Sequence, residues 1–327
     1  MRFVVLGAGA VGGVVGGRLA QHGHSVVLIA RGRHFEAIRG RGLRLESPDD
    51  IHTLDIPVVD HPSRISWADA DVVLLATKTQ DTEAALNDVA RVAPSHLPIF
   101  CVQNGVANER MALQLFTRVY GVFVWCPADH LTPGVVQVWC APKSGILHVG
   151  KYPAGSDQLA EAVAAAFTAS TFYAEAKSDI MRWKYRKLLS NLGNAVDALC
   201  GRAAQGTALA ARARQEAIEC FEAAGIAFVS DAEEDAARRE REVHPRTMNG
   251  VERRGGSSWQ SLERRLGTIE TDYLNGEIVR LGRRHGVPTP VNAVLQQLSQ
   301  RAARERTPPG TMSPVDILSL LDAAHTP

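Results

Sequence analysis

A lysine and two asparagines recur at helical spacing between residues 180 and 199. Lys187, Asn191 and Asn194 stand at positions i, i+4 and i+7, so one helix would place them on a single face. An ammonium group can donate a proton, and asparagine amides can hydrogen-bond hydroxyl or carbonyl groups. This face indicates a polar pocket able to support acid catalysis, and a solvated helix face is the alternative.

A carboxylate interrupts the apolar side of another expected helix, over residues 258–285. Leucines stand four residues before and four residues after Glu270. A carboxylate on an apolar stripe is costly unless it is paired or bound to something. We therefore expect Glu270 to face inward, with Lys187 as a candidate partner. Ser258, at the start of this helix, is typical on local grounds of an N-cap.

Three glycines near the N-terminus have the spacing GxGxxG, at Gly7, Gly9 and Gly12. A short apolar run at 3–6 precedes them, helical spacing follows, and a second apolar run comes at 26–29, so the motif lies inside a βαβ unit. In that context the first glycine makes the tight turn, the second lets the backbone approach a pyrophosphate, and the third allows close helix–strand packing. The motif predicts dinucleotide binding, the alternative being a purely structural turn.

The residues after the second strand indicate which dinucleotide is bound. NAD-binding units usually carry Asp or Glu there for the ribose 2′-hydroxyl, whereas this chain has Arg31, followed by Arg33. An arginine can clamp a 2′-phosphate through charge-assisted hydrogen bonds. We therefore expect NADP(H) as cofactor, bound by Arg31 with support from Arg33. The other arginines of 31–44 are typical of a basic, solvated loop.

Polar residues directly follow the next two expected strands, 70–76 and 98–102. Lys78 follows the first and Asn104, in an Asn-Gly pair, follows the second. The carboxyl ends of strands in an open α/β sheet face the ligand crevice. We expect Lys78 to meet cofactor or a substrate carboxylate, and Asn104 to lie beside the nicotinamide. The alternatives are an exposed loop lysine and an ordinary turn.

The order of elements predicts two domains and a tail. Strands and helices alternate up to about residue 175, which is typical of a doubly wound Rossmann sheet. Mostly helical spacing follows. We expect an α/β Rossmann-type NADP(H)-binding domain over 1–175, an all-α substrate and catalytic domain over 176–305, and a Pro-rich tail over 306–327. The helices expected after the seam span 180–199, 209–224, 232–242, 258–285 and 291–304.

Composition excludes several other classes of protein. Lys and Arg number 36 against 35 Asp and Glu in 327 residues, so no basic field favours nucleic acid. No apolar stretch has the ~20 residues of a membrane span, and the first residues form a core strand rather than a signal peptide. The 5 cysteines are scattered, which favours reduced thiols in the cytoplasm. The 11 histidines show no ligand spacing, so we expect no metal.

Taken in order, the motifs resemble the ketopantoate reductase (2-dehydropantoate 2-reductase) family. The resemblance runs from Met1 to about Leu298. It is carried by the glycine motif, the arginine after the second strand, the lysine after the third and the Asn-Gly after the fourth. It also rests on RKLLSN at Arg186–Asn191, GGSS at Gly255–Ser258, TIETDYLNG at Thr268–Gly276 and HGVPTP at His285–Pro290.

This resemblance implies a role for each candidate residue. Lys187 would be the general acid that protonates the carbonyl oxygen, and Glu270 would bind the cofactor ribose and organise that lysine. Lys78 and Asn104 would line the cofactor and substrate site. Ser258 would meet the substrate carboxylate, and Asn191 would hydrogen-bond the substrate, with Asn194 beside it. The implied reaction is reduction of 2-dehydropantoate to pantoate by NADPH, with the protein acting as a monomer or homodimer.

Three positions depart from the family pattern. The usual second asparagine is Ala195 here, an asparagine often found before the serines is Gly255, and the usual aspartate is Leu262. These positions touch the substrate in the family. The alternatives are therefore a different small 2-oxo or 3-oxo acid on the same fold, or a non-catalytic NADP(H)-binding sensor.

Overall fold

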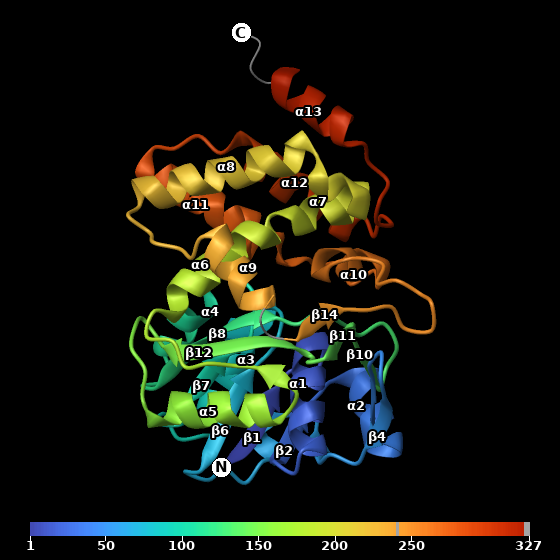
Figure 1. Ribbon diagram of the computed structural model, residues 1–327, viewed down its shortest axis with the longest axis vertical. Coiled ribbons are helices and arrows are strands. Elements are labelled where there is room, and N and C mark those ends of the chain that lie inside the picture. Colours follow the sequence, from blue (N-terminus) through green and yellow to red (C-terminus); the bar gives the residue numbers. More distant parts are fainter. Residues whose placement is uncertain (240–241, 324–327) are drawn as a thin grey trace. The chain divides into compact units, whose positions relative to one another are not determined.

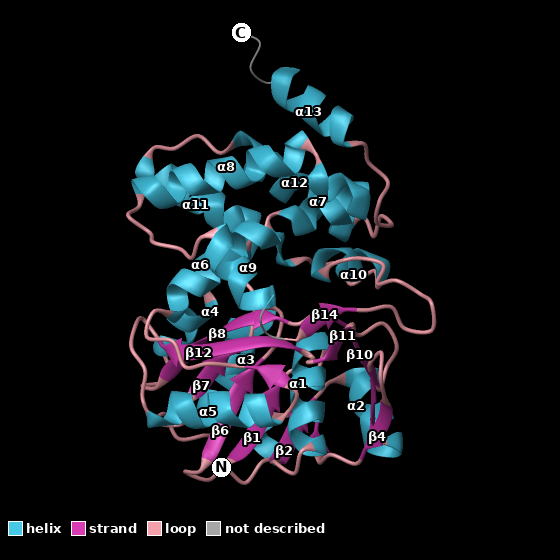
Figure 2. Ribbon diagram, in the orientation of Figure 1, coloured by secondary structure: helices cyan, strands magenta, loops and turns pink. Residues whose placement is uncertain are grey.

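The computed structural model describes residues 1–239 and 242–323. The chain divides into two compact units, and each is described by itself. The first contains Met1–Lys184 together with Val229–Arg253, and the second contains Tyr185–Phe228 and the chain from Arg254 onward. Helices and strands mix in the first unit, whereas the second is built of helices (Figure 2).

An eight-stranded sheet forms the centre of the first unit (Figure 1). Its strand order is β13-β12-β8-β7-β6-β1-β2-β5, and every neighbouring pair is parallel except β8 with β12. The strands are β1 (Arg2–Leu6), β2 (Ser25–Ile29), β5 (Val58–Val59), β6 (Asp71–Leu75), β7 (Ile99–Cys101), β8 (Val119–Trp125), β12 (Gly145–Lys151) and β13 (Phe172–Tyr173). This order confirms the predicted doubly wound sheet.

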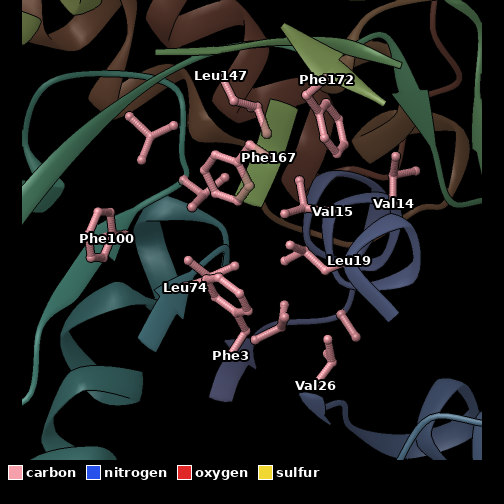
Figure 3. Close-up of a cluster of buried hydrophobic side chains, with 14 of the residues drawn as sticks. Phe3, Val14, Val15, Leu19, Val26, Leu74, Phe100, Leu147, Phe167 and Phe172 are labelled. Atoms are coloured by element: carbon pink, nitrogen blue, oxygen red, sulfur yellow. The ribbon is translucent and has the colours of Figure 1, made fainter. Parts of the chain in front are cut away.

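Apolar side chains from the sheet and its covering helices form the main core of the first unit. Figure 3 shows Phe3, Val15, Leu19, Phe100 and Phe167 directed toward one another, and all five are buried. Each buried side chain of this size contributes about 1.5–3 kcal/mol relative to leaving it in water. The helices of this unit are α1 (Ala10–Gln21), α2 (Gly32–Arg41), α3 (Thr82–Ala90), α4 (Asn108–Leu113), α5 (Gln158–Ala169) and α9 (Asp231–Arg239).

A smaller four-stranded sheet flanks the first helix. Its order is β4 (Ile51–Leu54), β3 (Leu43–Glu46), β10 (Val135–Val138), β9 (Ala128–Asp129). A further pair joins β11 (Cys140–Pro142) to β14 (Val243–Pro245). Because β11 and β14 pair, the segment 229–253 belongs to the first unit, although we expected it in the helical domain.

The basic segment 31–44 is not the loop that its charge suggested. Residues Gly32–Arg41 form helix α2, in which Phe35 and Ile38 are buried one helical turn apart. Arg39 and Arg41 are exposed, as expected, but they lie on a helix. The two apolar residues are enough to bury one face of this helix. The sequence analysis missed their helical spacing because arginines are frequent among the surrounding residues.

The second unit packs its helices around one apolar cluster. The helices are α6 (Ile180–Asn191), inside which the division between the units falls, α7 (Gly193–Cys200), α8 (Ala208–Ala223), α10 (Ser257–Glu263), α11 (Asn275–His285), α12 (Pro290–Arg304) and α13 (Pro314–Ala323). Val196, Leu209, Leu295 and Ile317 are among the buried residues of this cluster. No helix of the described residues is long and apolar enough to cross a bilayer.

Several predicted boundaries in the helical part were wrong. The helix expected over 180–199 is two helices separated at Leu192, and the helix expected over 258–285 is α10, a 3₁₀ turn at Glu270–Tyr273, and α11. The helix expected over 232–242 is α9, with 240–241 outside the described residues. The division between the two compact units falls at Lys184. The domain boundaries expected at 175 and 305 stay a prediction.

The Pro-rich tail assigned to 306–327 contains a helix, a possibility that the sequence left open. Residues Pro314–Ala323 form α13, and Ile317 and Leu321 are both 1% exposed within the helical core. Residues 324–327 lie outside the described part of the chain. This segment therefore completes the second unit's core instead of extending from it.

Candidate functional site

The three glycines lie in the turn between β1 and α1, and packing accounts for two of them. Gly7 has φ +103°, and a Cβ there would lie 2.9 Å from the nitrogen of Thr77. A Cβ on Gly12 would lie 2.1 Å from the Gly7 oxygen. Any side chain at either position would force the turn apart, so only glycine is compatible with this geometry.

Gly9 has a different environment from the other two glycines. It is the N-cap of α1, and a Cβ on it would meet no atom within 4 Å. Open space at a helix N-terminus, with no side-chain cap, leaves its backbone N–H groups available to an anion. The turn therefore fits a dinucleotide diphosphate at Gly9, as the motif predicted.

Arg31 is exposed at the end of β2. Its side chain is 60% exposed, and its Nη2 lies 3.4 Å from Asp88 Oδ2. Asp88 also pairs with Arg91, at 3.2 Å. Exposed ion pairs of this length contribute little, so Arg31 can exchange Asp88 for a phosphate at small cost. Its contact with a 2′-phosphate stays a prediction.

Lys78 and Asn104 follow adjacent parallel strands, β6 and β7. Lys78 precedes the 3₁₀ turn Thr79–Asp81, and Asn104 lies in the turn before α4. Both therefore lie at the carboxyl edge of the sheet, on the same side as the glycine turn. The structure brings the turns that hold Gly7, Lys78 and Asn104 to one edge, since Gly7 packs against Thr77.

A buried hydrogen-bond network, which the sequence analysis missed, joins these two turns. Gln103 Nε2 donates to the Thr77 oxygen at 3.0 Å and to Thr82 Oγ1 at 2.8 Å. Thr82 Oγ1 donates to Asn108 Oδ1 at 2.9 Å, and Asn108 Nδ2 donates to the Asn104 oxygen at 3.2 Å. The signals in the sequence were Gln103, a polar residue just after the apolar strand, and Asn108, four residues after Asn104.

The side chain of Asn104 contains an unused hydrogen-bond acceptor. Its Oδ1 is buried and has no hydrogen-bond partner within residues 1–239 and 242–323. A buried acceptor without a partner costs about 1–3 kcal/mol. An amide donor from a ligand would remove that cost, and the carboxamide of a nicotinamide is such a donor.

A buried ion pair lies beside the same turn. Lys184 Nζ is 2.5 Å from Glu109 Oε1 and donates to the Gln103 oxygen at 3.0 Å, and both charged side chains are at most 2% exposed. Burial, reinforced by the Glu109 charge, raises the pKa of the Cys101 thiol well above its usual value. Cys101 is therefore a neutral, structural thiol. The sequence analysis missed this pair because its members are far apart in the chain.

In the second unit, a break at a single residue, Leu192, separates α6 from α7. Lys187 and Asn191 both lie in α6, at i and i+4, and so share a face. Asn194 belongs to α7, and Leu192 keeps helical dihedral angles (φ −60°, ψ −33°), so the place of Asn194 on the same face stays a prediction. Gly193, a poor helix former, begins the new helix, and Asn275 Nδ2 donates to the Leu192 oxygen at 3.4 Å.

Asn191 is buried with an unused donor. It is 4% exposed, and within the described chain its Nδ2 has no hydrogen-bond partner. An amide donor at this position, one turn from Lys187, can bind a hydroxyl or carbonyl oxygen of a ligand. The predicted pairing of this lysine with Glu270 stays a prediction.

The serines lie in the first turn of α10, beside α7. The N-cap is Gly256, not Ser258, so the local expectation of a serine cap was wrong. Asp197 Oδ2 accepts the Gly256 N–H at 2.6 Å, and a Cβ on Gly256 would lie 3.1 Å from Asn194 Oδ1. The structure thus brings Asn194 close to the serine turn, and Ser258 is 2% exposed within it.

Glu270 is buried, but not for the predicted reason. It begins a 3₁₀ turn, and Leu266 is 42% exposed, so no continuous helical stripe surrounds it. Ile269 and Leu274 are each 2% exposed, and Glu270 itself is 5% exposed. The expected inward position of the carboxylate is confirmed. The continuous helix from which we argued that position was wrong.

No group of three or more His, Cys, Asp or Glu residues within the described ranges could hold a metal ion. The candidate polar groups described above for each unit are amides, hydroxyls, lysines and carboxylates. Such groups can bind, orient and exchange protons with a carbonyl substrate.

The comparison with known proteins assigns the family. Residues 3–154 match the family ketopantoate reductase PanE/ApbA, and residues 179–303 match its C-terminal domain. The chain belongs to this family. It is therefore an oxidoreductase, 2-dehydropantoate 2-reductase-like, of a family that uses a nicotinamide cofactor. This excludes the sensor alternative.

Individual relatives agree with this assignment. The 2-dehydropantoate 2-reductase of Pyrococcus horikoshii is 30% identical over 303 residues, covering 91% of this chain and 96% of the relative. The structure of a PanE/ApbA family ketopantoate reductase from Ralstonia eutropha JMP134 has 30% identity and a TM-score of 0.77, covering 94% of this chain and 99% of that one.

A third relative shares the fold at lower identity. The ternary structure of D-mandelate dehydrogenase with NADH and anilino(oxo)acetate has a TM-score of 0.79 at 24% identity, covering 94% and 99% of the two chains. At that identity the likeness shows the fold alone.

Proposed function

We propose that this protein reduces 2-dehydropantoate to pantoate with NADPH. The observation that carries the proposal is the position of Lys187 on α6, one turn before Asn191, whose buried Nδ2 has no hydrogen-bond partner among the described residues. A proton donor beside an amide donor suits a substrate carrying a ketone and a neighbouring hydroxyl. The named activity of the P. horikoshii relative supports the same substrate.

In this proposal the chain's own residues bind, orient and protonate the substrate. Lys187 donates a proton to the carbonyl oxygen as C2 is reduced, and Glu270 organises that lysine and binds the cofactor ribose. Asn191 and Asn194 hydrogen-bond the substrate, and Ser258 binds its carboxylate. When bound, the reduced nicotinamide supplies the hydride that C2 receives.

In this proposal the first unit binds the phosphates and the nicotinamide of the cofactor. Gly7, Gly9 and Gly12 receive the diphosphate, and Arg31 binds the 2′-phosphate of NADP(H). Lys78 and Asn104 line the nicotinamide end, where the Asn104 Oδ1 acceptor awaits an amide donor. NADH, present in the D-mandelate dehydrogenase structure, is the competing cofactor.

A second candidate keeps the cofactor and changes the substrate to a less polar 2-oxo acid. The three departures from the family pattern are apolar or crowded here. Ala195 and Leu262 are buried in the helical core, and a Cβ on Gly255 would lie 2.3 Å from Trp259 Cγ. An asparagine could not replace Gly255 without displacing that indole. Loss of polar contacts at these positions favours an oxo acid with fewer hydroxyls.

Reduction of two closely matched oxo acids separates these candidates. Ketopantoate carries a 4-hydroxyl that 2-oxoisovalerate lacks, and a site built to bind a hydroxyl discriminates strongly against its absence. We expect a higher kcat/KM for ketopantoate, measured by the fall in NADPH absorbance. Comparable values for the two would contradict selection of the 4-hydroxyl, and turnover of another oxo acid alone would exclude pantoate formation. Either result leaves the reductase class intact.

A further inference from the structure

A histidine outside every motif discussed so far contacts the glycine turn. His34, on α2, has its Nε2 2.7 Å from the oxygen of Ala8, the residue between Gly7 and Gly9. On the other side of its ring, the N–H of Gly134 donates to His34 Nδ1 at 2.9 Å. This one imidazole therefore bridges α2, the glycine turn and the segment leading into β10.

The two contacts define the tautomer of His34. Because Nδ1 accepts from Gly134, the proton of the neutral ring lies on Nε2, which then donates to the Ala8 oxygen. The Ala8 N–H in turn donates to the Ile29 oxygen at 3.1 Å. Both backbone groups of Ala8 are thus bound, which fixes the peptide planes on either side of Ala8, and the second of these planes leads into Gly9.

A second histidine supports the ring of the first. The rings of His34 and His130 have centroids 4.0 Å apart, and His130 is 6% exposed. His130 Nδ1 lies 3.0 Å from the Val135 oxygen, close to Gly134 in the chain. The His34 ring is therefore held by packing as well as by hydrogen bonds, so its direction toward Ala8 is set by the surrounding structure.

We infer that His34 is a positioning residue of the dinucleotide site, acting through the Ala8 carbonyl to hold the diphosphate turn open. It also stands three residues after Arg31, so it connects the two parts of the chain expected to bind the cofactor's phosphates. The inference rests on the proposed cofactor function. It differs from a 2′-phosphate contact, because the diphosphate is common to NADPH and NADH.

Three substitutions separate the two hydrogen bonds of His34. His34→Gln retains an amide donor that reaches about as far as Nε2, and so keeps the bond to Ala8. His34→Asn places an oxygen near the Nδ1 position, and so keeps the bond from Gly134 but cannot reach Ala8. His34→Leu loses both. His22→Leu is a matched control, because His22 Nδ1 contacts the Arg18 oxygen at 2.9 Å at the opposite end of α1.

The measurement is the Kd of the full-length protein for NADPH and for NADH, by nicotinamide fluorescence, with far-UV circular dichroism for folding. We expect His34→Leu and His34→Asn to weaken both dinucleotides by a similar factor, about 3- to 10-fold, the usual effect of one hydrogen bond. His34→Gln and His22→Leu are expected within about 2-fold of the parent. KM for the oxo acid should change less than KM for NADPH.

Several results would overturn the inference. Parental affinity in His34→Asn together with weak binding in His34→Gln would mean that dinucleotide affinity depends on the hydrogen bond from Gly134 and not on the one to Ala8. Weakening confined to NADPH would assign His34 to the 2′-phosphate. If His34→Leu fails to fold, the comparison of the Gln and Asn variants still shows which of the two hydrogen bonds supports dinucleotide binding. A parent protein that binds neither dinucleotide would overturn the proposed function, and this inference with it.

Discussion

At the scale of single residues, the proposed chemistry depends on side chains that differ widely in exposure. Arg31 is 60% exposed, whereas Asn191 and Glu270 are each at most 5% exposed. An exposed arginine can change partners freely, so it suits a cofactor that enters and leaves. Buried polar groups keep a fixed geometry, so they suit the reacting carbonyl.

Replacement of Arg31 by aspartate tests the cofactor assignment. We expect Arg31→Asp to weaken NADPH binding by about 10- to 150-fold, the effect of losing a charge-assisted contact of ~1.5–3 kcal/mol, with much less effect on NADH. Arg39→Asp, in helix α2 directly after Arg31 and also exposed, is the control. Unchanged NADPH affinity, measured by fluorescence titration, would mean that the 2′-phosphate is bound elsewhere.

Replacement of Lys187 by methionine tests the proposed acid. We expect Lys187→Met to lower kcat by ~10²–10⁴, the usual contribution of a positioned acid, while NADPH still binds. Single-turnover absorbance measurements report the chemical step, and fluorescence titration reports cofactor binding. Near-parental turnover would remove this lysine from the mechanism.

At the scale of elements, Arg18 of α1 fixes the β3–β4 hairpin. Its guanidinium contacts both carboxylate oxygens of Asp50, at 3.0 and 3.1 Å, and Ser144 Oγ at 3.1 Å, and the arginine is 4% exposed. Burial acts to raise the pKa of Asp50, but the hydrogen bonds from Arg18 and Ser47 outweigh it and lower the pKa well below 3.8. The ion pair therefore joins the glycine-motif helix to the smaller sheet.

The lowered pKa of Asp50 gives a pH-dependent prediction. A carboxyl with a lowered pKa stabilises the fold above its unfolded pKa, and this contribution is lost as pH falls toward the folded pKa. We expect Asp50→Asn to lower the free energy of unfolding by about 1 kcal/mol at pH 7, a value reduced for the partial exposure of Asp50. The difference from the parent should shrink below about pH 4, as urea denaturation would measure. Asp69→Asn is the control, because Asp69 lies 2.9 Å from His96 Nε2 in an exposed pair. A loss of stability that is independent of pH, or one equalled by Asp69→Asn, would contradict the prediction.

At the scale of the whole molecule, cofactor binding and stability are linked. A ligand that binds only the native state stabilises it by RT ln(1 + [L]/Kd), which is about 2.7 kcal/mol at 100 times Kd. We expect saturating NADPH to raise Tm by several degrees, and NADH at the same concentration to raise it less. Scanning calorimetry of the full chain with each dinucleotide would measure this. An equal rise with both would contradict the assignment to NADP(H).

The sequence alone determined the features that depend on local patterns. The apolar runs around the GxGxxG motif predicted β1, α1 and β2, and Gly7 and Gly12 proved to be required by close packing. The doubly wound sheet and the helical second part followed from the order of such runs. The buried position of Glu270 was predicted as well, because its apolar neighbours Ile269 and Leu274 are buried whether a helix or a 3₁₀ turn carries them.

Only the tertiary structure decided what depends on contacts between distant residues. The break at Leu192 moved Asn194 to a new helix, the pairing of β14 with β11 placed 229–253 in the first unit, and burial of Ile317 drew the tail into the helical core. The contact of His34 with Ala8 and the pair Lys184–Glu109 have no local signal. Helix ends and strand partners are set by long-range packing and hydrogen bonding, which no single stretch of sequence contains.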